Sequence, residues 1–179
     1  MPPLVRSAVP FVSPLTIGRL PVALKMLAGA ESVRGRGPRR VARKAAKIWF
    51  RLAHGLLGLP ARGEILVATP QGAKSVSFDG RNTHFNCLYM PEFVAGYEAS
   101  SLALLDILVG RDGCFFDVGS NFGCFSLSIA ARPGFTGRVH AFEPYAPSFA
   151  DLSNMIERSA LTALISAHRL ALSDYDGNG

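Results

Sequence analysis

The stretch that decides the fold is Phe115-Phe116-Asp117-Val118-Gly119-Ser120-Asn121-Phe122-Gly123. A short apolar run ends in an acid, two glycines then allow a tight turn, and apolar residues at helical spacing follow directly. This order predicts a strand, a turn and a helix, as in a parallel α/β sheet. In such a unit the turn lies at the amino end of the helix, where backbone N–H groups and the helix dipole can receive a negatively charged group of a ligand.

The sequence after this turn alternates in the manner of a βαβ fold. The strands are expected at residues 114–118, 138–143 and 164–172, and the helices between them at residues 123–131 and from Pro147 onward. An Asp-Gly turn at residues 176–177 follows the third strand. The fold class predicted for this part of the chain is therefore α/β, with a parallel sheet.

Two carboxylates stand at the ends of neighbouring predicted strands, Asp117 after the first and Glu143 after the second. In a right-handed βαβ unit both ends lie along the same edge of the sheet, so Glu143 can face a ligand held by the first turn. A carboxylate there suits a ribose diol, because two hydroxyls can donate to its two oxygens. A buried carboxylate that only caps the turn explains the spacing equally well.

The spacing argues against two other nucleotide-binding motifs. A dinucleotide fingerprint needs Gly-x-Gly-x-x-Gly, and Asn121 occupies the second glycine position. A P-loop needs a lysine after its last glycine, and Cys124 follows Gly123. A nicotinamide-dependent oxidoreductase is therefore disfavoured.

The chain before the turn divides into a β-rich part and a helix. Residues rich in β-formers at 64–68, 74–78 and 83–89 predict two or three antiparallel strands, separated by Pro-Gln-Gly and Asp-Gly turns. The apolar spacing over residues 97–108 predicts a helix that leads into the first central strand.

The first third of the chain is strongly basic. Residues 1–62 hold twelve of the 19 Lys and Arg residues and a single acid, Glu31, whereas the remainder carries net negative charge. Residues 1–40 are rich in Pro, Gly and Arg, which favours a poorly ordered, solvated extension. The single Arg-Gly-Arg-Gly run lacks repetition and interleaved aromatic residues, so no specific nucleic-acid binding is expected.

Residues 41–59 predict a basic amphipathic helix that ends near Gly58 and Pro60. Its apolar residues include Ile48, Trp49 and Leu52. Packing of these residues on the body of the protein is the favoured interpretation. A peripheral contact with an anionic membrane surface stays open, because a basic face beside Trp and Leu is what such helices use.

Cysteine and histidine provide no sign of a metal site. Cys87, Cys114 and Cys124 form no Cys-x-x-Cys pair and have no histidine at zinc-finger spacing, which fits free thiols in a reducing compartment and a cytoplasmic location. Spacing reveals no partner for the four histidines, which are His54, His84, His140 and His168. His140 and His168 lie in predicted strands and are expected to be structural.

Four motifs resemble, in order, those of the FkbM family of S-adenosylmethionine-dependent methyltransferases. They are residues 116–123, Ala141-Phe142-Glu143-Pro144, Asn154 in the next helix, and Ala171-Leu172-Ser173-Asp174 followed by Asp176-Gly177. Gly96-Tyr97-Glu98 is similar to the family's entry into its first helix, and the resemblance covers about residues 64–179. Ser120 stands where the family usually has Ala, and Ser159 where a second Asn is common.

The resemblance implies a class I methyltransferase fold, which is Rossmann-like, and S-adenosylmethionine as cofactor. Glu143 would bind the ribose hydroxyls, Tyr145 would lie near the adenine, and Ala171 and Leu172 would border it. The turn would surround the methionine part of the cofactor through Asp117, Gly119, Ser120, Asn121 and Gly123. The implied reaction is O-methylation of a small molecule or a glycan hydroxyl, and no residue is assigned as catalytic.

The resemblance stops after the third central strand. The family continues with a fourth strand bearing an Asp-x-Glu-Gly type motif and with three further strands. Residues 63–179 are thus expected to form the N-terminal half of such a domain, preceded by the extension of residues 1–62, and to leave one side of the sheet exposed. The alternative is a catalytically inactive remnant or binding module whose basic leader docks on a membrane or a polyanion.

Overall fold

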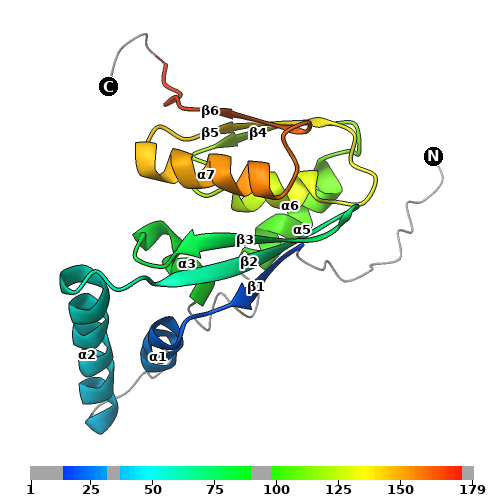
Figure 1. Ribbon diagram of the computed structural model, residues 1–179. Coiled ribbons are helices and arrows are strands. Elements are labelled where there is room, and N and C mark those ends of the chain that lie inside the picture. The colour runs from blue at the N-terminus through cyan, green and yellow to red at the C-terminus, as the bar shows by residue number, and fades with distance from the viewer. Residues whose placement is uncertain (1–13, 32–36, 90–97, 175–179) are drawn as a thin grey trace.

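Two three-stranded sheets and the helices around them make up the fold. The computed structural model describes residues 14–31, 37–89 and 98–174. Figure 1 shows four layers: the sheet β4–β6 at the top, helices α6 and α7 beneath it, the sheet β1–β3 next, and α1 and α2 at the bottom. Helices α6 and α7 thus lie between the two sheets, and each contacts strands of both.

The parallel sheet contains β4 (Cys114–Val118), β5 (Arg138–Phe142) and β6 (Ile165–His168) in the order β4-β5-β6. All its strand pairs are parallel, and the crossover helices are α6 (Cys124–Ala130) and α7 (Ala146–Arg158). The predicted α/β fold with a parallel sheet is confirmed. The third strand is shorter than the predicted 164–172, because the chain leaves the sheet after His168.

The two faces of the parallel sheet differ. Successive side chains of a strand point to opposite faces, and Val139, Ala141 and Ile165 are buried on the face that carries α6 and α7. On the opposite face Phe116 and Val118 are more than half exposed. As expected, one face of the sheet is therefore left open within the described part of the chain.

The antiparallel sheet contains β1 (Leu15–Arg19), β2 (Arg62–Thr69) and β3 (Gly72–Asp79) in the order β1-β2-β3. Strands β2 and β3 confirm the predictions at 64–68 and 74–78. The strand predicted at 83–89 is wrong, because these residues form the short helices η2 (Thr83–Phe85) and α3 (Asn86–Tyr89). The fully buried Phe85 ring lies 4.9 Å from Phe78 and 5.2 Å from Phe122, measured between ring centroids.

The prediction of a poorly ordered extension through residue 40 is wrong for residues 15–31 and for residues 38–40, where α2 begins. Strand β1 supplies the third strand of the antiparallel sheet, with Leu15 opposite Val67 and Ile17 opposite Ile65. Helix α1 (Val22–Glu31) follows and buries Leu24 completely. Residues 1–13 and 32–36 of the predicted extension lie outside the described residues.

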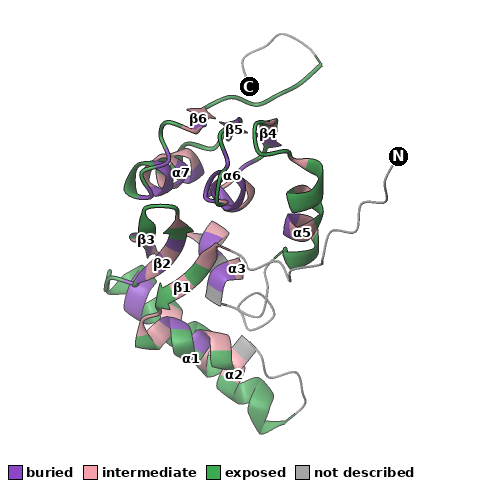
Figure 2. Cartoon of the chain, turned by 90° about the vertical axis from the view of Figure 1, so that its right-hand side faces the viewer, coloured by how far each residue is buried: buried purple, intermediate pink, exposed green. Residues whose placement is uncertain are grey.

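Helix α5 (Ala99–Leu108) leads into β4, close to the helix predicted at 97–108, of which residue 97 is not described. It contacts α6 and buries Leu102, whereas Leu104, Ile107 and Leu108 are exposed. In Figure 2 it flanks the layer of α6 and α7 as a separate helix.

The predicted basic helix is α2 (Pro38–Phe50), which continues as the π-helical segment η1 (Arg51–Leu56). Helix α2 contacts α1, yet no side chain of α2 is buried, as its colouring in Figure 2 shows. The favoured interpretation, packing through Ile48, Trp49 and Leu52, is wrong, since these side chains are 59%, 54% and 45% exposed. Among the described residues, no helix is both long and apolar enough to cross a bilayer.

The cysteines of the central unit should differ in reactivity. Cys114 is exposed and Cys124 is buried, and burial raises the pKa of the Cys124 thiol to about 12. We therefore expect a disulfide reagent at pH 8 to modify Cys114 in the native protein, and Cys124 only after unfolding, because the thiolate is the reactive form. Peptide mapping by mass spectrometry resolves each site. Equal labelling rates for the two thiols in the native protein would contradict the structure.

Candidate functional site

The turn between β4 and α6 is built from residues in the left-handed region. Gly119, Asn121 and Gly123 have φ values of 74°, 56° and 92°. Glycine adopts such values without steric cost, and asparagine tolerates them better than most side chains. The two glycines of the motif therefore match the backbone that this turn requires, as predicted, and Asn121 adopts the same region, which was not predicted.

Backbone hydrogen bonds attach the turn to the end of β5. The N–H groups of Gly119 and Ser120 both donate to the carbonyl oxygen of Phe142, at 2.9 and 3.0 Å, and the N–H of Gly123 donates to the Ser120 oxygen at 2.8 Å. The turn after β4 thus lies over the carboxyl end of β5. Glu143, the next residue of the chain, is held beside it.

Asp117 caps the first turn of α6 from inside the protein. Its Oδ2 accepts hydrogen bonds from the backbone N–H and the hydroxyl of Ser126, at 3.1 and 2.5 Å, and the residue is 5% exposed. Burial raises the pKa of the Asp117 carboxyl, and the two hydrogen bonds from Ser126 partly oppose this. The amino end of α6 is therefore already capped by a carboxyl group of the protein.

Several N–H groups of the turn are already engaged within the chain. Those of Gly119, Ser120, Asn121, Gly123 and Ser126 all donate to acceptors of the protein. A phosphate at this helix end would also face the Asp117 carboxyl. The expectation that N–H groups of the turn receive an anionic ligand group stays a prediction, with fewer groups left to do so.

Glu143 is buried beside the turn and bridges two backbone segments. Its Oε2 accepts the N–H of Asn121 and its Oε1 accepts the N–H of Tyr145, both at 2.9 Å. A carboxylate oxygen can accept more than one hydrogen bond. Glu143 therefore caps the turn, as one of the two interpretations held, and each oxygen still has acceptor capacity for a ligand hydroxyl.

Two polar atoms of the turn are buried without a hydrogen-bond partner among the described residues. They are the hydroxyl of Ser120 and the side-chain oxygen Oδ1 of Asn121. A buried polar atom without a partner costs about 1–3 kcal/mol, so such atoms point to a missing partner. Both lie in the turn that contacts Glu143, which fits a polar ligand bound between the turn and that carboxylate.

The remaining predicted site residues lie at the same edge of the sheet. Tyr145 precedes α7 and is 63% exposed. Ala171 and Leu172 follow the last residue of β6, the strand next to β5, and both are exposed. Their positions at the carboxyl ends of parallel strands are compatible with one site, and their contact with a ligand stays a prediction.

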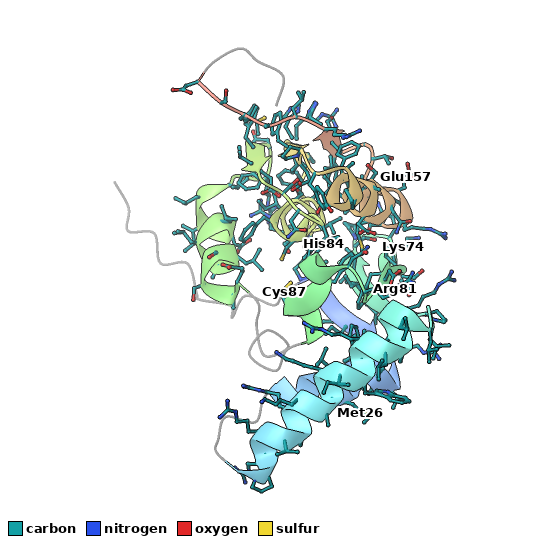
Figure 3. The ribbon with its side chains drawn as sticks, turned by 90° about the vertical axis from the view of Figure 1, so that its left-hand side faces the viewer. Met26, Lys74, Arg81, His84, Cys87 and Glu157 are labelled. Atoms are coloured by element: carbon teal, nitrogen blue, oxygen red, sulfur yellow. The ribbon has the colours of Figure 1, made fainter. Side chains whose placement is uncertain are left out.

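The histidines have partners that the sequence did not reveal. His140 Nδ1 lies 3.2 Å from His168 Nε2 on the neighbouring strand. On the open face His140 stacks with Phe116 and His168 stacks with Phe142. His84, labelled in Figure 3, lies 2.8 Å from the Asp151 carboxylate and so links η2 to α7. No group of three or more potential metal ligands occurs among the described residues.

Sequence reasoning missed Ser126 and the carbonyl of Phe142 as parts of the site. Ser126 follows Asp117 by nine residues and lies in the first turn of α6. A hydroxyl in the first turn of a helix that follows an acid-ended strand is a signal that could have indicated this cap. The Phe142 carbonyl carries no such signal, because its role depends on how β4 and β5 pair.

Comparisons with known proteins identify no family. No family model matches the chain, and no curated protein matches it. The solved structure of Pyrococcus horikoshii TYW2 in complex with MeSAdo is similar to 75% of this chain and 49% of its own, with 16% identity and a TM-score of 0.44.

A second Pyrococcus horikoshii protein, described provisionally as a transferase, is similar to 74% of this chain and 49% of its own, with 14% identity and a TM-score of 0.45. The chain thus spans about half the length of each solved protein. Identities and TM-scores this low carry no argument about activity. The function of the chain has to be argued from its own site.

Proposed function

We propose that the chain is the cofactor-binding part of an S-adenosylmethionine-dependent methyltransferase of FkbM type. The proposed reaction is O-methylation of a small molecule or a glycan hydroxyl, in the cytoplasm. The observation that carries the proposal is the pair of partnerless buried oxygens, Ser120 Oγ and Asn121 Oδ1, in the turn that contacts the Glu143 carboxylate.

The polar groups of this edge match the donors that the cofactor presents. Ribose offers two hydroxyl donors, which Glu143 can accept, and the amino group of the methionine part is a donor that Ser120 and Asn121 can accept. This arrangement uses two side chains of the turn and the Glu143 carboxylate beside it, and the backbone of the turn can stay as it is.

The charge of the site favours this cofactor over a phosphate-bearing one. S-adenosylmethionine carries a sulfonium and no phosphate, so its positive charge is compatible with the carboxyls of Asp117 and Glu143. A dinucleotide pyrophosphate binds backbone N–H groups, and several of those in this turn already donate to Phe142, Ser120 and Asp117. The same carboxyls would repel it.

When bound, the cofactor supplies a methyl group on a sulfonium, which an acceptor oxygen can attack in line. Such a displacement depends on positioning. Glu143, Ser120 and Asn121 would orient the cofactor, while Asp117 fixes the start of α6. The proposal assigns the acceptor subsite to other segments of the enzyme and names no catalytic base.

The test measures binding of S-adenosylhomocysteine to the 179-residue chain by calorimetry. Replacing Glu143 by glutamine keeps its shape but removes the charge, and hydrogen bonds to a charged partner are worth about 1.5–3 kcal/mol. We expect the affinity to fall about tenfold or more. Glu157→Gln is the matched control, since Glu157 is exposed on α7 (Figure 3) and should leave binding unchanged.

Thermal unfolding of both variants separates a binding defect from a folding defect, because Glu143 also accepts two backbone N–H groups. Unchanged affinity in a folded Glu143→Gln protein would contradict the site. If the native chain binds no S-adenosylhomocysteine at all, the alternative of a non-catalytic binding module replaces the proposal.

A further inference from the structure

We propose that helix α2 docks the protein onto an anionic lipid surface through an apolar stripe that faces away from the body. The stripe, called the α2 stripe below, consists of Val41, Ala45, Ile48, Trp49 and Leu52. The spacing of Val41, Ala45, Ile48 and Leu52 by three or four residues puts them on one side of the helix, and Trp49 adjoins Ala45. The proposal is independent of the cofactor site.

The side of α2 that meets the body is a different one. The residues with reduced exposure are Arg43, Ala46 and Phe50, followed by the buried Ala53 at the start of η1. Phe50 packs against the hydrophobic core, and its ring centroid is 4.8 Å from that of His54. These positions also repeat every three or four residues, so they form the seam between α2 and the rest of the molecule.

The seam and the α2 stripe lie on nearly opposite sides. Val41 and Arg43 are two positions apart, which corresponds to a rotation of about 200° around a helix of 3.6 residues per turn. The exposures agree: Val41 and Ile48 are 66% and 59% exposed, whereas Ala53 is 3% exposed. The residues of the α2 stripe are thus turned toward solvent.

Basic residues line the helix beside the stripe. Arg40, Lys44 and Arg51 are exposed and lie four and seven residues apart, which aligns them along one edge of the stripe. Arg39 is exposed as well, and residues 38–62 contain no acid. A surface of this kind is complementary to negative charge.

The exposed apolar surface continues past the helix. Leu56, Leu57 and Leu59 are 78%, 67% and 48% exposed around the left-handed Gly58. In Figure 1 α2 stands at the end of the molecule farthest from the parallel sheet, beside α1. In Figure 3 α2 lies in front of α1. A flat partner could therefore approach the stripe without meeting the sheets.

The combination of charge and apolar area favours lipid over nucleic acid. A nucleic acid would engage the arginines and lysines through its phosphates but would leave Ile48 and Leu52 in water. An anionic membrane surface accommodates both, because the apolar face enters the boundary of headgroups and acyl chains while the basic groups remain at the phosphates. Trp49 has the amphipathic ring that such a boundary favours.

Trp49 is the only tryptophan of the chain and reports on its own environment. The experiment titrates the full chain with vesicles of phosphatidylcholine alone and with vesicles of equal parts phosphatidylcholine and phosphatidylglycerol. We expect a blue shift of the emission and quenching by brominated lipid with the anionic vesicles only. High salt should weaken binding, since the Debye length shrinks from about 10 Å at 0.1 M to about 3 Å at 1 M.

Two pairs of variants separate charge from apolar contact. Arg40→Gln with Lys44→Gln should lower the vesicle partition coefficient about thirtyfold, at about 1 kcal/mol for each basic residue near the surface. Arg158→Gln with Arg169→Gln, two exposed arginines outside α2, should leave it unchanged. Ile48→Ser should lower it roughly tenfold, whereas Ile107→Ser, at an exposed isoleucine of α5, should not.

The proposal fails if the anionic vesicles produce no blue shift, or if Ile48→Ser binds them as well as the native chain. Salt-sensitive binding of a single-stranded RNA without a Trp49 shift, in the absence of vesicle binding, would also overturn it. The affinity for S-adenosylhomocysteine tests the cofactor site separately. It should be unchanged in the α2 variants, because their substitutions lie far from the β4–β5 edge.

Discussion

Replacing Gly123 by alanine is expected to lower the free energy of unfolding by about 2–5 kcal/mol. Gly123 has a φ of 92°, and a Cβ there would lie 2.6 Å from Cδ1 of Leu152. The left-handed conformation costs an alanine about 1–2 kcal/mol, and overpacking adds about 1–3 kcal/mol. Leu152 is fully buried in α7, so its side chain has little room to move away.

Gly119 provides the matched control in the same turn. Its φ of 74° is also left-handed, but no atom lies within 4 Å of a Cβ at that position. Gly119→Ala should therefore cost only the backbone strain, about 1–2 kcal/mol. Urea denaturation of the two variants measures the difference directly.

A double variant tests the contact itself. If Leu152 causes the extra cost, Gly123→Ala with Leu152→Ala should cost clearly less than the sum of the single changes, because the smaller side chain makes room for the new Cβ. Additive costs, or equal costs at Gly119 and Gly123, would contradict the close packing of the turn against α7.

The second large effect is expected at Asp117. Asp117→Ala removes the acceptor for the N–H and hydroxyl of Ser126, which is fully buried, and should lower the free energy of unfolding by about 2–4 kcal/mol. Asp117→Asn keeps an acceptor oxygen and should retain most of the stability at neutral pH. Thermal and urea unfolding of the two variants measure both effects.

The difference in stability between the native protein and Asp117→Asn should change with pH in a defined direction. Burial raises the pKa of Asp117 in the folded state above the ordinary value of 3.8, so the folded state binds the proton more tightly than the unfolded chain. Between the unfolded and the folded pKa, the contribution of the Asp117 carboxyl to the free energy of unfolding falls as pH rises. The native protein should therefore lose stability relative to Asp117→Asn as pH rises from 3.8 through the folded pKa, and remain level above it.

A rise in the relative stability of the native protein over that interval would mean that the hydrogen bonds from Ser126 outweigh burial.

The central unit could be predicted because its local signals agree with its tertiary environment. The apolar run at 114–118 and the glycines at 119 and 123 predict a strand and a tight turn, and both are found, although β4 leaves Phe116 and Val118 exposed. The position of Glu143 beside the turn follows from the handedness of the βαβ unit alone. The hydrogen bond from the N–H of Asn121 to the Glu143 carboxylate confirms that position.

The sequence predictions are wrong where tertiary packing overrides the local preference of the residues. The β-forming residues at 83–89 adopt short helices because the Phe85 ring fits between Phe78 and Phe122. The apolar residues of α2 were expected to face the protein, but its inner side is the narrower seam of Ala46, Phe50 and Ala53. The spacing of apolar residues shows that a helix has an apolar side, but it does not show which part of the protein, if any, packs on that side.

Pairings between distant segments were beyond sequence reasoning. His140 meets His168 only because β5 and β6 align in a particular register, with Phe142 opposite His168. Likewise, nothing in residues 15–19 indicates that they pair with residues 64–67 across more than forty positions. Such contacts depend on the whole chain.

The pairing of β1 with β2 has a consequence for the order in which the chain folds. Leu15 emerges from the ribosome long before its partner Val67, so β1 has to wait until β2 has been synthesised. During that interval its apolar residues and those of α1 lack their final contacts, and exposed segments of this kind bind chaperones or aggregate. Slowing translation before residue 62 should therefore reduce the yield of soluble protein more than the same delay placed after residue 79.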